Sequence, residues 1–289
     1  MAEVGLVVFA RTALAVCRGV LPDYRSRYSK HMFTQPQVLS ILCLMRYEDW
    51  TFREAEVRLA EHRELRAVLG LASVPDYTTL YRFMRRLNPA VLNEVLAATL
   101  QHGPSGGTNP KATVAVDATG LASGAISSFF VKRVKDRGNG FEWRHWLKWL
   151  MVVDTERRMI AAQQARRGPY NDCAALRPLV DIASQTFSIG WVLADAEFDS
   201  ERNHQHIRQT LKATSVIPAK RGKATWRIHG IRAQMRKRFP RRKYGQRSLI
   251  ESVISAVKRK LSARAPGRST ETQRLQALLL GIAYNLYRI

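Results

Sequence analysis

The hydrophobic pattern of this 289-residue chain changes its period at the segment QHGPSGGTNPKA, residues 101–112. Before it, apolar residues recur at helical spacing almost throughout; after it, β-branched residues alternate in short runs. Crowded Gly, Pro, Ser and Asn are typical of a connection between structured units. We therefore expect a helical domain over residues 1–100, a linker at 101–112 and a second domain over 113–289.

Strand-like and helix-like runs alternate in the second domain. TVAVDATG, WLKWLMVVD and RRMIAAQQAR predict three strands, the last two flanking a turn at DTER. Helical segments then separate two further short strands, WVLAD and ATSVIP, and an apolar helix closes the chain. Strands that first form a meander and then alternate with helices indicate an α/β fold with a mixed sheet flanked by helices.

The first domain contains two capped helices, the second of which has a basic outer face. A T-x-x-E capping box opens one helix at Thr51, and Asp76 caps a second, YTTLYRFMRRL. The apolar stripe of the second helix leaves Arg82, Arg85 and Arg86 on its outer face. A helix-turn-helix whose last helix enters a DNA groove fits this pattern, and so does a plain bundle helix with solvated arginines.

Positive charge dominates the composition and is densest late in the chain. Lys and Arg number 47 against 23 Asp and Glu, a formal net charge of +24. Residues 202–250 contain fifteen Lys or Arg and no carboxylate, with Trp226, Phe239 and Tyr244 interleaved. Such a run repels itself unless a polyanion covers it, and aromatic rings can stack on bases. The composition therefore predicts a nucleic-acid partner, bound with a steep dependence on salt.

Several other classes of protein fit the sequence poorly. No apolar run approaches the roughly 20 residues of a membrane-spanning helix, and the N-terminus lacks a secretory leader, so we expect a cytoplasmic protein without a membrane partner. Cys17, Cys43 and Cys173 are odd in number and far apart, which argues against a disulfide framework or a zinc site. The H-x-H pair at His204 and His206 favours exposed helical positions over metal ligation.

A helix predicted after the basic run places four chemically different groups on one face. At 100° per residue they fall within about 60° of one another. They are Tyr244, Arg247, Glu251 and Lys258. The opposite face is apolar and would dock the helix against a core. A solvated helix with an Arg247–Glu251 pair fits the same spacing, but the carboxylate-free basic run before Glu251 favours a working face.

Two aspartates, Asp117 and Asp195, are each expected at the carboxyl end of an apolar strand. Asp is depleted in strands and a buried unpaired carboxylate is costly, so each needs water, a capping role or a cation. A turn-forming role explains one such Asp. Together with Glu251, however, they supply three carboxylates from two strand ends and a docked helix, and such a set can hold two divalent ions through oxygen ligands.

These motifs resemble those of the DDE transposases of prokaryotic insertion sequences, within the retroviral-integrase and ribonuclease-H-like superfamily. VAVDATG is similar to their first-aspartate motif and VLADAEFDS to their second, D-x-x-[YF]-D-S, with Phe198 where many members carry Tyr. Four positions match the Y-x2-R-x3-E-x6-K signature of one branch: Tyr244, Arg247, Glu251 and Lys258. The resemblance runs from about residue 111 to residue 289; residues 1–100 resemble the helical N-terminal region of the family less distinctively.

The resemblance implies a ribonuclease-H-like fold and a transposase that binds the terminal inverted repeats of an insertion sequence, cleaves DNA strands and transfers them. Asp117, Asp195 and Glu251 would be the catalytic residues and would hold two Mg2+ ions, for which Mn2+ can substitute. The expected DNA-binding residues are Tyr244, Arg247, Lys258, Arg241, Arg242 and Lys243, with Arg82, Arg85 and Arg86 from the first domain. The implied partners are double-stranded DNA, at transposon ends and target, and a second copy in a synaptic homodimer, associated with the nucleoid.

Two alternatives stay open at this point. One is a metal-dependent nuclease of the same fold that hydrolyses strands without transferring them. The other is a catalytically silent remnant or regulator that binds DNA, or a basic protein that binds RNA. Three carboxylates facing a polyanion bring no advantage to a pure binder, which favours an enzyme.

Overall fold

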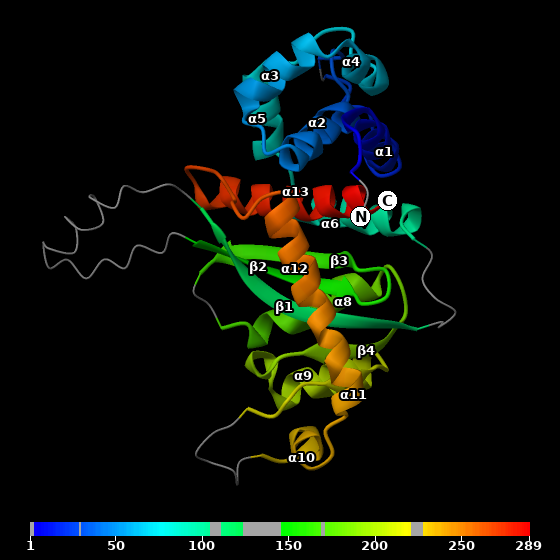
Figure 1. The fold of residues 1–289 in the computed structure, drawn as a ribbon, viewed down its shortest axis with the longest axis vertical. Helices are drawn as coiled ribbons and strands as arrows, with labels where there is room; N and C mark the ends of the chain where they lie inside the picture. The colour runs from blue at the N-terminus through cyan, green and yellow to red at the C-terminus, as the bar shows by residue number, and fades with distance from the viewer. Residues whose placement is uncertain (1–2, 29, 105–110, 124–145, 169–170, 221–227) are drawn as a thin grey trace, which may run out of the picture.

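The computed structural model describes residues 3–28, 30–104, 111–123, 146–168, 171–220 and 228–289 (Figure 1). The helices in these ranges are α1 (Leu6–Arg18), α2 (Gln35–Tyr47), α3 (Phe52–Glu61), α4 (Arg63–Leu69), α5 (Tyr77–Arg85), α6 (Pro89–His102), α8 (Leu176–Ser184), α9 (Glu201–Gln205), α10 (Gly230–Lys237), α11 (Arg241–Tyr244), α12 (Ser248–Lys260) and α13 (Thr270–Arg288). The strands are β1 (Ala112–Ala122), β2 (Trp146–Asp154), β3 (Met159–Arg167), β4 (Ile189–Ala194) and β5 (Thr214–Val216). None of the described helices is both long and apolar enough to span a membrane.

Within the described residues, the strands form a five-stranded sheet in the order β3-β2-β1-β4-β5. β1, β2 and β3 pair antiparallel, whereas β4 pairs parallel with both β1 and β5. The turn predicted at DTER joins β2 to β3, and the Asp154 carboxylate fixes it by accepting hydrogen bonds from the backbone N–H groups of Glu156 and Arg157. The predicted mixed sheet flanked by helices is confirmed, and it is consistent with a ribonuclease-H-like domain.

Both faces of the sheet are buried under helices (Figure 1). Val114 and Val116 of β1 belong to the apolar cluster that includes α8. Ala115 belongs to the opposite cluster, which includes Val253 of α12 and much of α13. Because side chains alternate between the faces of a strand, Asp117 shares the face of Ala115 and lies on the α12 side of the sheet.

Helix α13 joins the sheet to the N-terminal helices. It lies beside α6 and contacts both β3 and α2 (Figure 1). The buried Asn285 side chain hydrogen-bonds the backbone N–H and C=O of Ile160 in β3 and the Thr99 hydroxyl in α6. A continuous apolar cluster therefore runs from α1 and α2 through α13 to the sheet. The division into domains at 101–112 stays a prediction, and residues 105–110 lie outside the described residues.

The predicted position of Asp117 at a strand end is wrong, because β1 continues for five residues beyond it. The antiparallel pairing with β2 extends from Val114 to Ala122 and keeps this part of the chain extended. The parallel partner β4 ends sooner, with Ala194 opposite Val116. Asp117 thus lies in the middle of β1, at the point where that strand loses its parallel neighbour.

The helix predicted from residue 244 onward is also divided in the structure. Tyr244 ends the short helix α11, Gly245–Arg247 form a 3-10 turn, and α12 begins at Ser248. The apolar stripe of α12 is nevertheless buried as predicted, at Ile250, Val253 and Val257.

Candidate active site

The register of the sheet brings Asp117 and Asp195 to neighbouring positions. Val116 pairs in parallel with Ala194, and the next residue of each chain segment is one of the two aspartates. Adjacent strands lie about 4.8 Å apart. Each carboxylate is held through its Oδ1 atom, which accepts the Ala118 N–H at 2.8 Å in Asp117 and the Glu197 N–H at 2.8 Å in Asp195. The parallel pairing therefore places two acidic residues at neighbouring positions, where β4 ends beside the middle of β1.

Arg247 links the third carboxylate to the first. Its Nη1 lies 3.1 Å from Asp117 Oδ2, and its Nη2 lies 2.6 Å from Glu251 Oε1. Burial raises the pKa of Asp117; the Ala118 N–H and Arg247 counteract this rise, and the charges of Asp195 and Glu251 reinforce it. The Glu251 side chain is 57% exposed, whereas that of Arg247 is 19% exposed. Glu251 is therefore the carboxylate with the most freedom to rotate.

Tyr244 borders this group of charges. Its ring packs edge-to-face against Phe239, with centroids 4.9 Å apart, and the guanidinium carbon of Arg247 lies 5.8 Å from its centroid. Burial raises the pKa of Tyr244, Arg247 opposes the rise, and the nearby Asp195 carboxylate reinforces it. The structure thus brings five of the predicted site residues together: Asp117, Asp195, Tyr244, Arg247 and Glu251.

Lys258 lies apart from that group. It follows Glu251 by seven residues on α12, which is about 10 Å along the helix axis. Burial lowers its pKa. Within the described part of the chain its ammonium has no hydrogen-bond or ion-pair partner. A phosphate could therefore bind there without displacing a protein contact.

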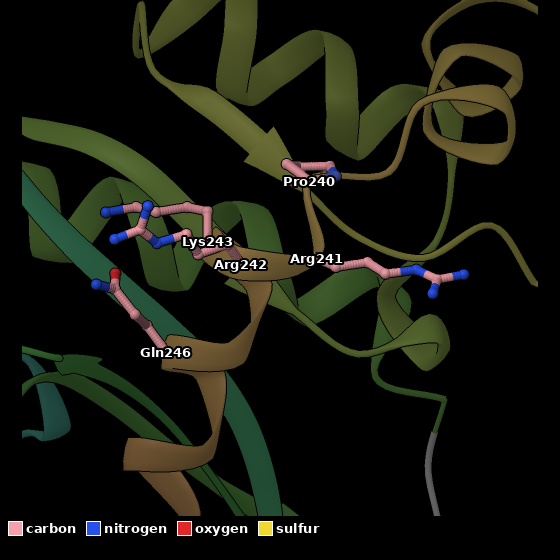
Figure 2. Close-up of a pocket in the computed structure, with 5 residues that line it drawn as sticks. All are labelled: Pro240, Arg241, Arg242, Lys243 and Gln246. Carbon is pink, nitrogen blue, oxygen red and sulfur yellow. The ribbon is translucent and has the colours of Figure 1, made fainter.

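The basic residues before Tyr244 line a cavity of about 430 Å³ (Figure 2). Figure 2 shows Arg242 and Lys243 on the same side of α11 as Gln246, whereas Arg241 points the opposite way. Lys243 Nζ donates to Thr113 Oγ1 at 2.8 Å and lies 5.3 Å from the centroid of Trp191. These contacts connect the basic wall to the start of β1 and to β4.

The predicted N-terminal arginines lie elsewhere, Arg82 and Arg85 on α5 and Arg86 at its C-cap. Arg82, Arg85 and Arg86 are exposed, and in the described structure none of them contacts the three carboxylates. The capping box at Thr51 and the cap at Asp76 are present as predicted. In the chain, helix α4 comes between α3 and α5, the two helices of the expected helix-turn-helix. Recognition of DNA by α5 therefore stays a prediction.

As they stand, no three His, Cys, Asp or Glu side chains among the described residues are close enough together to hold a metal ion. At the carboxylates, the Arg247 guanidinium lies between Asp117 and Glu251. The donor set still fits Mg2+, because Asp117 and Asp195 offer carboxylate oxygens from neighbouring positions and the exposed Glu251 can rotate toward them. This fit requires Arg247 to release the Glu251 carboxylate and the Oδ2 atom of Asp117.

Asp199, for which the sequence analysis predicted no separate role, docks α10 onto the segment after Asp195. Its carboxylate accepts two hydrogen bonds from Arg232, from Nε at 2.9 Å and from Nη2 at 2.7 Å, and one from the Lys220 N–H at 2.8 Å. Glu201 accepts the backbone N–H of Arg232 in the first turn of α10. The sequence did hint at this contact, because Asp199 and Glu201 are the last carboxylates before the basic run and are therefore its nearest acidic partners along the chain.

The prediction that His204 and His206 are exposed is wrong for His204 and only partly right for His206. His204 is fully buried, with Nδ1 2.7 Å from Ser215 Oγ and Nε2 3.7 Å from Asp199 Oδ1. His206 is half-buried, and its Nε2 lies 2.6 Å from Asp181 Oδ1. Asp199, Ser215 and Asp181 lie outside the H-x-H motif, so the spacing of the two histidines carried no sign of these partners.

Comparison with protein families identifies the domain that carries this site. A family model described as Transposase DDE domain matches residues 108–286, which is more than half of the chain and includes Asp117, Asp195 and Glu251. A search of curated proteins finds no match. The chain therefore belongs to the family of transposases with a DDE domain.

Proposed function

We propose that this transposase binds the terminal inverted repeats of an insertion sequence and catalyses metal-dependent cleavage and transfer of DNA strands. The observation that carries the proposal is the register that sets Asp117 beside Asp195, with Glu251 linked to Asp117 through Arg247. The family match supports a transposase in general. The charge of +24 supports a polyanionic partner.

In this proposal Asp117, Asp195 and Glu251 hold two Mg2+ ions, which would activate water or a DNA 3′-hydroxyl and stabilise the leaving oxygen at phosphorus. Arg247 changes partner when Glu251 turns toward Asp195. Its guanidinium fork suits two oxygens of one phosphate, and its contacts with Asp117 and Glu251 support a role in holding that phosphate near the carboxylates. Tyr244, packed on Phe239, limits where Arg247 can move.

The phosphate backbone on either side of the cut would follow two basic surfaces. Arg242 and Lys243 lie N-terminal to the carboxylate-bearing helix, and Lys258 lies about 10 Å beyond Glu251. Contacts with phosphates fix the position of the DNA without reading its sequence. We assign sequence recognition to Arg82 and Arg85 of α5 and to Arg86 at its C-cap. We assign synapsis of two ends to a homodimer on nucleoid DNA.

The test is incubation of the purified protein with a labelled duplex that carries the DNA flanking its own gene, with Mg2+ or with a chelator. Cuts at a defined end that require Mg2+, followed by joined products on a second duplex, are expected. Cuts without joined products would replace the proposal with a nuclease of the same fold. Binding without cuts would instead identify a DNA-binding regulator.

A further inference from the structure

A second cavity, of about 740 Å³, lies between the N-terminal helices and the segment that follows α12. Aromatic rings and arginines dominate its wall. The rings are Trp50, Phe52, Tyr77 and Tyr81, and the arginines are Arg46, Arg53, Arg264 and Arg268. Cavities of this size take small organic ligands, and a nucleotide is within that range.

The rings offer faces and edges to a flat ligand. Tyr81 is 38% exposed and meets Phe52 edge-to-face, with centroids 5.6 Å apart. The guanidinium carbon of Arg53 lies 4.7 Å from the centroid of Tyr77. Nucleobases stack on such rings whatever their sequence, because every base has a π-face.

The charge in the wall suits a phosphate. Asp49 is the carboxylate among the lining residues, and Arg46 already pairs with it at 3.0 Å while donating to the Arg264 carbonyl at 2.9 Å. In the described part of the chain, Arg53, Arg264 and Arg268 have no carboxylate partner. Three positive groups are thus left to attract an anion.

A buried polar atom in the same wall also favours a polar ligand. Gln276 is 5% exposed, and its Oε1 has no hydrogen-bond partner among the residues that the structure describes. Buried acceptors are normally satisfied. A base carries N–H donors that a hydrocarbon ligand lacks.

Backbone hydrogen bonds connect this cavity to the carboxylates. Ala122, the last residue of β1, donates to the Ala263 carbonyl at 3.0 Å and accepts the Ala265 N–H at 2.8 Å, next to the lining residue Arg264. Asp117 lies five residues earlier on β1, which at about 3.4 Å per residue is roughly 17 Å. A DNA duplex rises about 3.4 Å per base pair, so this span corresponds to about five base pairs.

We propose that this cavity binds one nucleotide, with its base against Tyr81 and Trp50 and its phosphate against Arg53, Arg264 and Arg268. The same chemistry is offered by a nucleotide unstacked from DNA bound at the carboxylates and by a free nucleotide. The DNA source rests on the proposed function, whereas the free source does not.

The DNA source is tested by a mismatch scan. Single mismatches are placed in turn at each of the ten base pairs next to the cut in the flanking-DNA duplex, and binding is measured without metal. A mismatch lowers the cost of unpairing a base. Wild-type binding should tighten about tenfold at one position near the fifth pair; Tyr81→Ala should abolish this gain, and Tyr28→Ala, at an aromatic that is 81% exposed and outside the cavity, should keep it.

The free source is tested by calorimetry with deoxyadenosine monophosphate, and deoxyribose 5-phosphate serves as the ligand without a base. The nucleotide should bind the wild type at least tenfold more tightly than it binds Tyr81→Ala or Arg268→Ala, both changes at exposed side chains. A positive result in either experiment supports the cavity and identifies the source. The proposal is overturned if these substitutions change neither the gain in duplex binding at a mismatch nor the affinity for the mononucleotide. Mononucleotide binding by a protein that fails to bind the duplex would refute the proposed function and leave the cavity standing.

Discussion

Replacing Asp199 with Asn should loosen α10 and remove stability that depends on the charge of the carboxylate. The Asp199 side chain is 0% exposed and its ion-pair partner Arg232 is 22% exposed. Asn keeps the size of the side chain and can still accept the Lys220 N–H, but it loses the ion pair at 2.7 Å. Charge-assisted pairs with two parallel hydrogen bonds are among the stronger polar contacts in proteins.

The pKa of Asp199 sets both the size and the pH window of the effect. Although burial opposes its charge, the His204 ring, Arg232 and the Lys220 N–H lower the pKa from an ordinary 3.8 to about 2. At about 1.36 kcal/mol per unit this is roughly 2.5 kcal/mol, which solvent screening reduces to about 1–2 kcal/mol. Because the folded pKa lies below the unfolded one, this stability is fully present above about pH 5 and is lost as the pH falls toward 2.

Urea unfolding from pH 7 down to pH 2.5 measures the effect, with Glu197→Gln as the control at an exposed carboxylate nearby. Asp199→Asn should lower the free energy of unfolding by about 1–2 kcal/mol at pH 7 and by much less at pH 2.5. Hydrogen exchange should accelerate in Gly230–Lys237. If Asp199→Asn lowers the free energy of unfolding by the same amount at every pH, the reasoning is refuted, because the loss would then come from a change in packing and not from the lost charge.

Three further predictions concern DNA and metal. Arg247→Gln should lower the Mn2+ concentration that half-saturates the protein several-fold in an EPR titration without DNA, because Arg247 competes for Asp117 and Glu251; an unchanged titration would show that it does not compete. Arg85→Ala combined with Arg86→Ala should weaken binding to the inverted repeat about tenfold while the Mg2+ dependence of cleavage stays the same, and unaltered end binding in a gel-shift assay would reduce α5 to scaffold. Arg242→Ala should weaken binding to all duplexes alike. In a salt titration, the plot of log K against log salt concentration should become less steep by about one unit.

Sequence analysis predicted correctly those features that depend on interactions between residues close together in the chain. The caps at Thr51 and Asp76 and the Asp154 turn were readable because each rests on side chains within three residues of the backbone that they satisfy. The Arg247–Glu251 contact was readable as a spacing of four on a helix. Its extension to Asp117 was not, because that partner is 130 residues away and its position depends on the sheet.

The misplaced features depend on pairing between distant segments. β1 is long because β2 pairs along it, and the alternation within TVAVDATG does not record where a partner strand ends. α10 was missed because its most evident sequence feature is positive charge, while the acids that dock it, Asp199 and Glu201, lie about thirty residues earlier. The exposure of His204 was misjudged because Ser215, eleven residues later, and Asp199, five residues earlier, meet its ring only in the folded chain.

The central claim is that Asp117, Asp195 and Glu251 act together in cutting DNA, and one matched pair of variants tests it most directly. Cleavage of the flanking-DNA duplex in Mg2+ is compared for the wild type, Asp195→Asn and Glu197→Gln, two residues apart on the same segment. Asp195→Asn should abolish cleavage while DNA binding is kept or strengthened, because it removes an ion ligand and a charge that repels phosphate. Glu197→Gln should cleave like the wild type. Undiminished cleavage by Asp195→Asn would contradict the account.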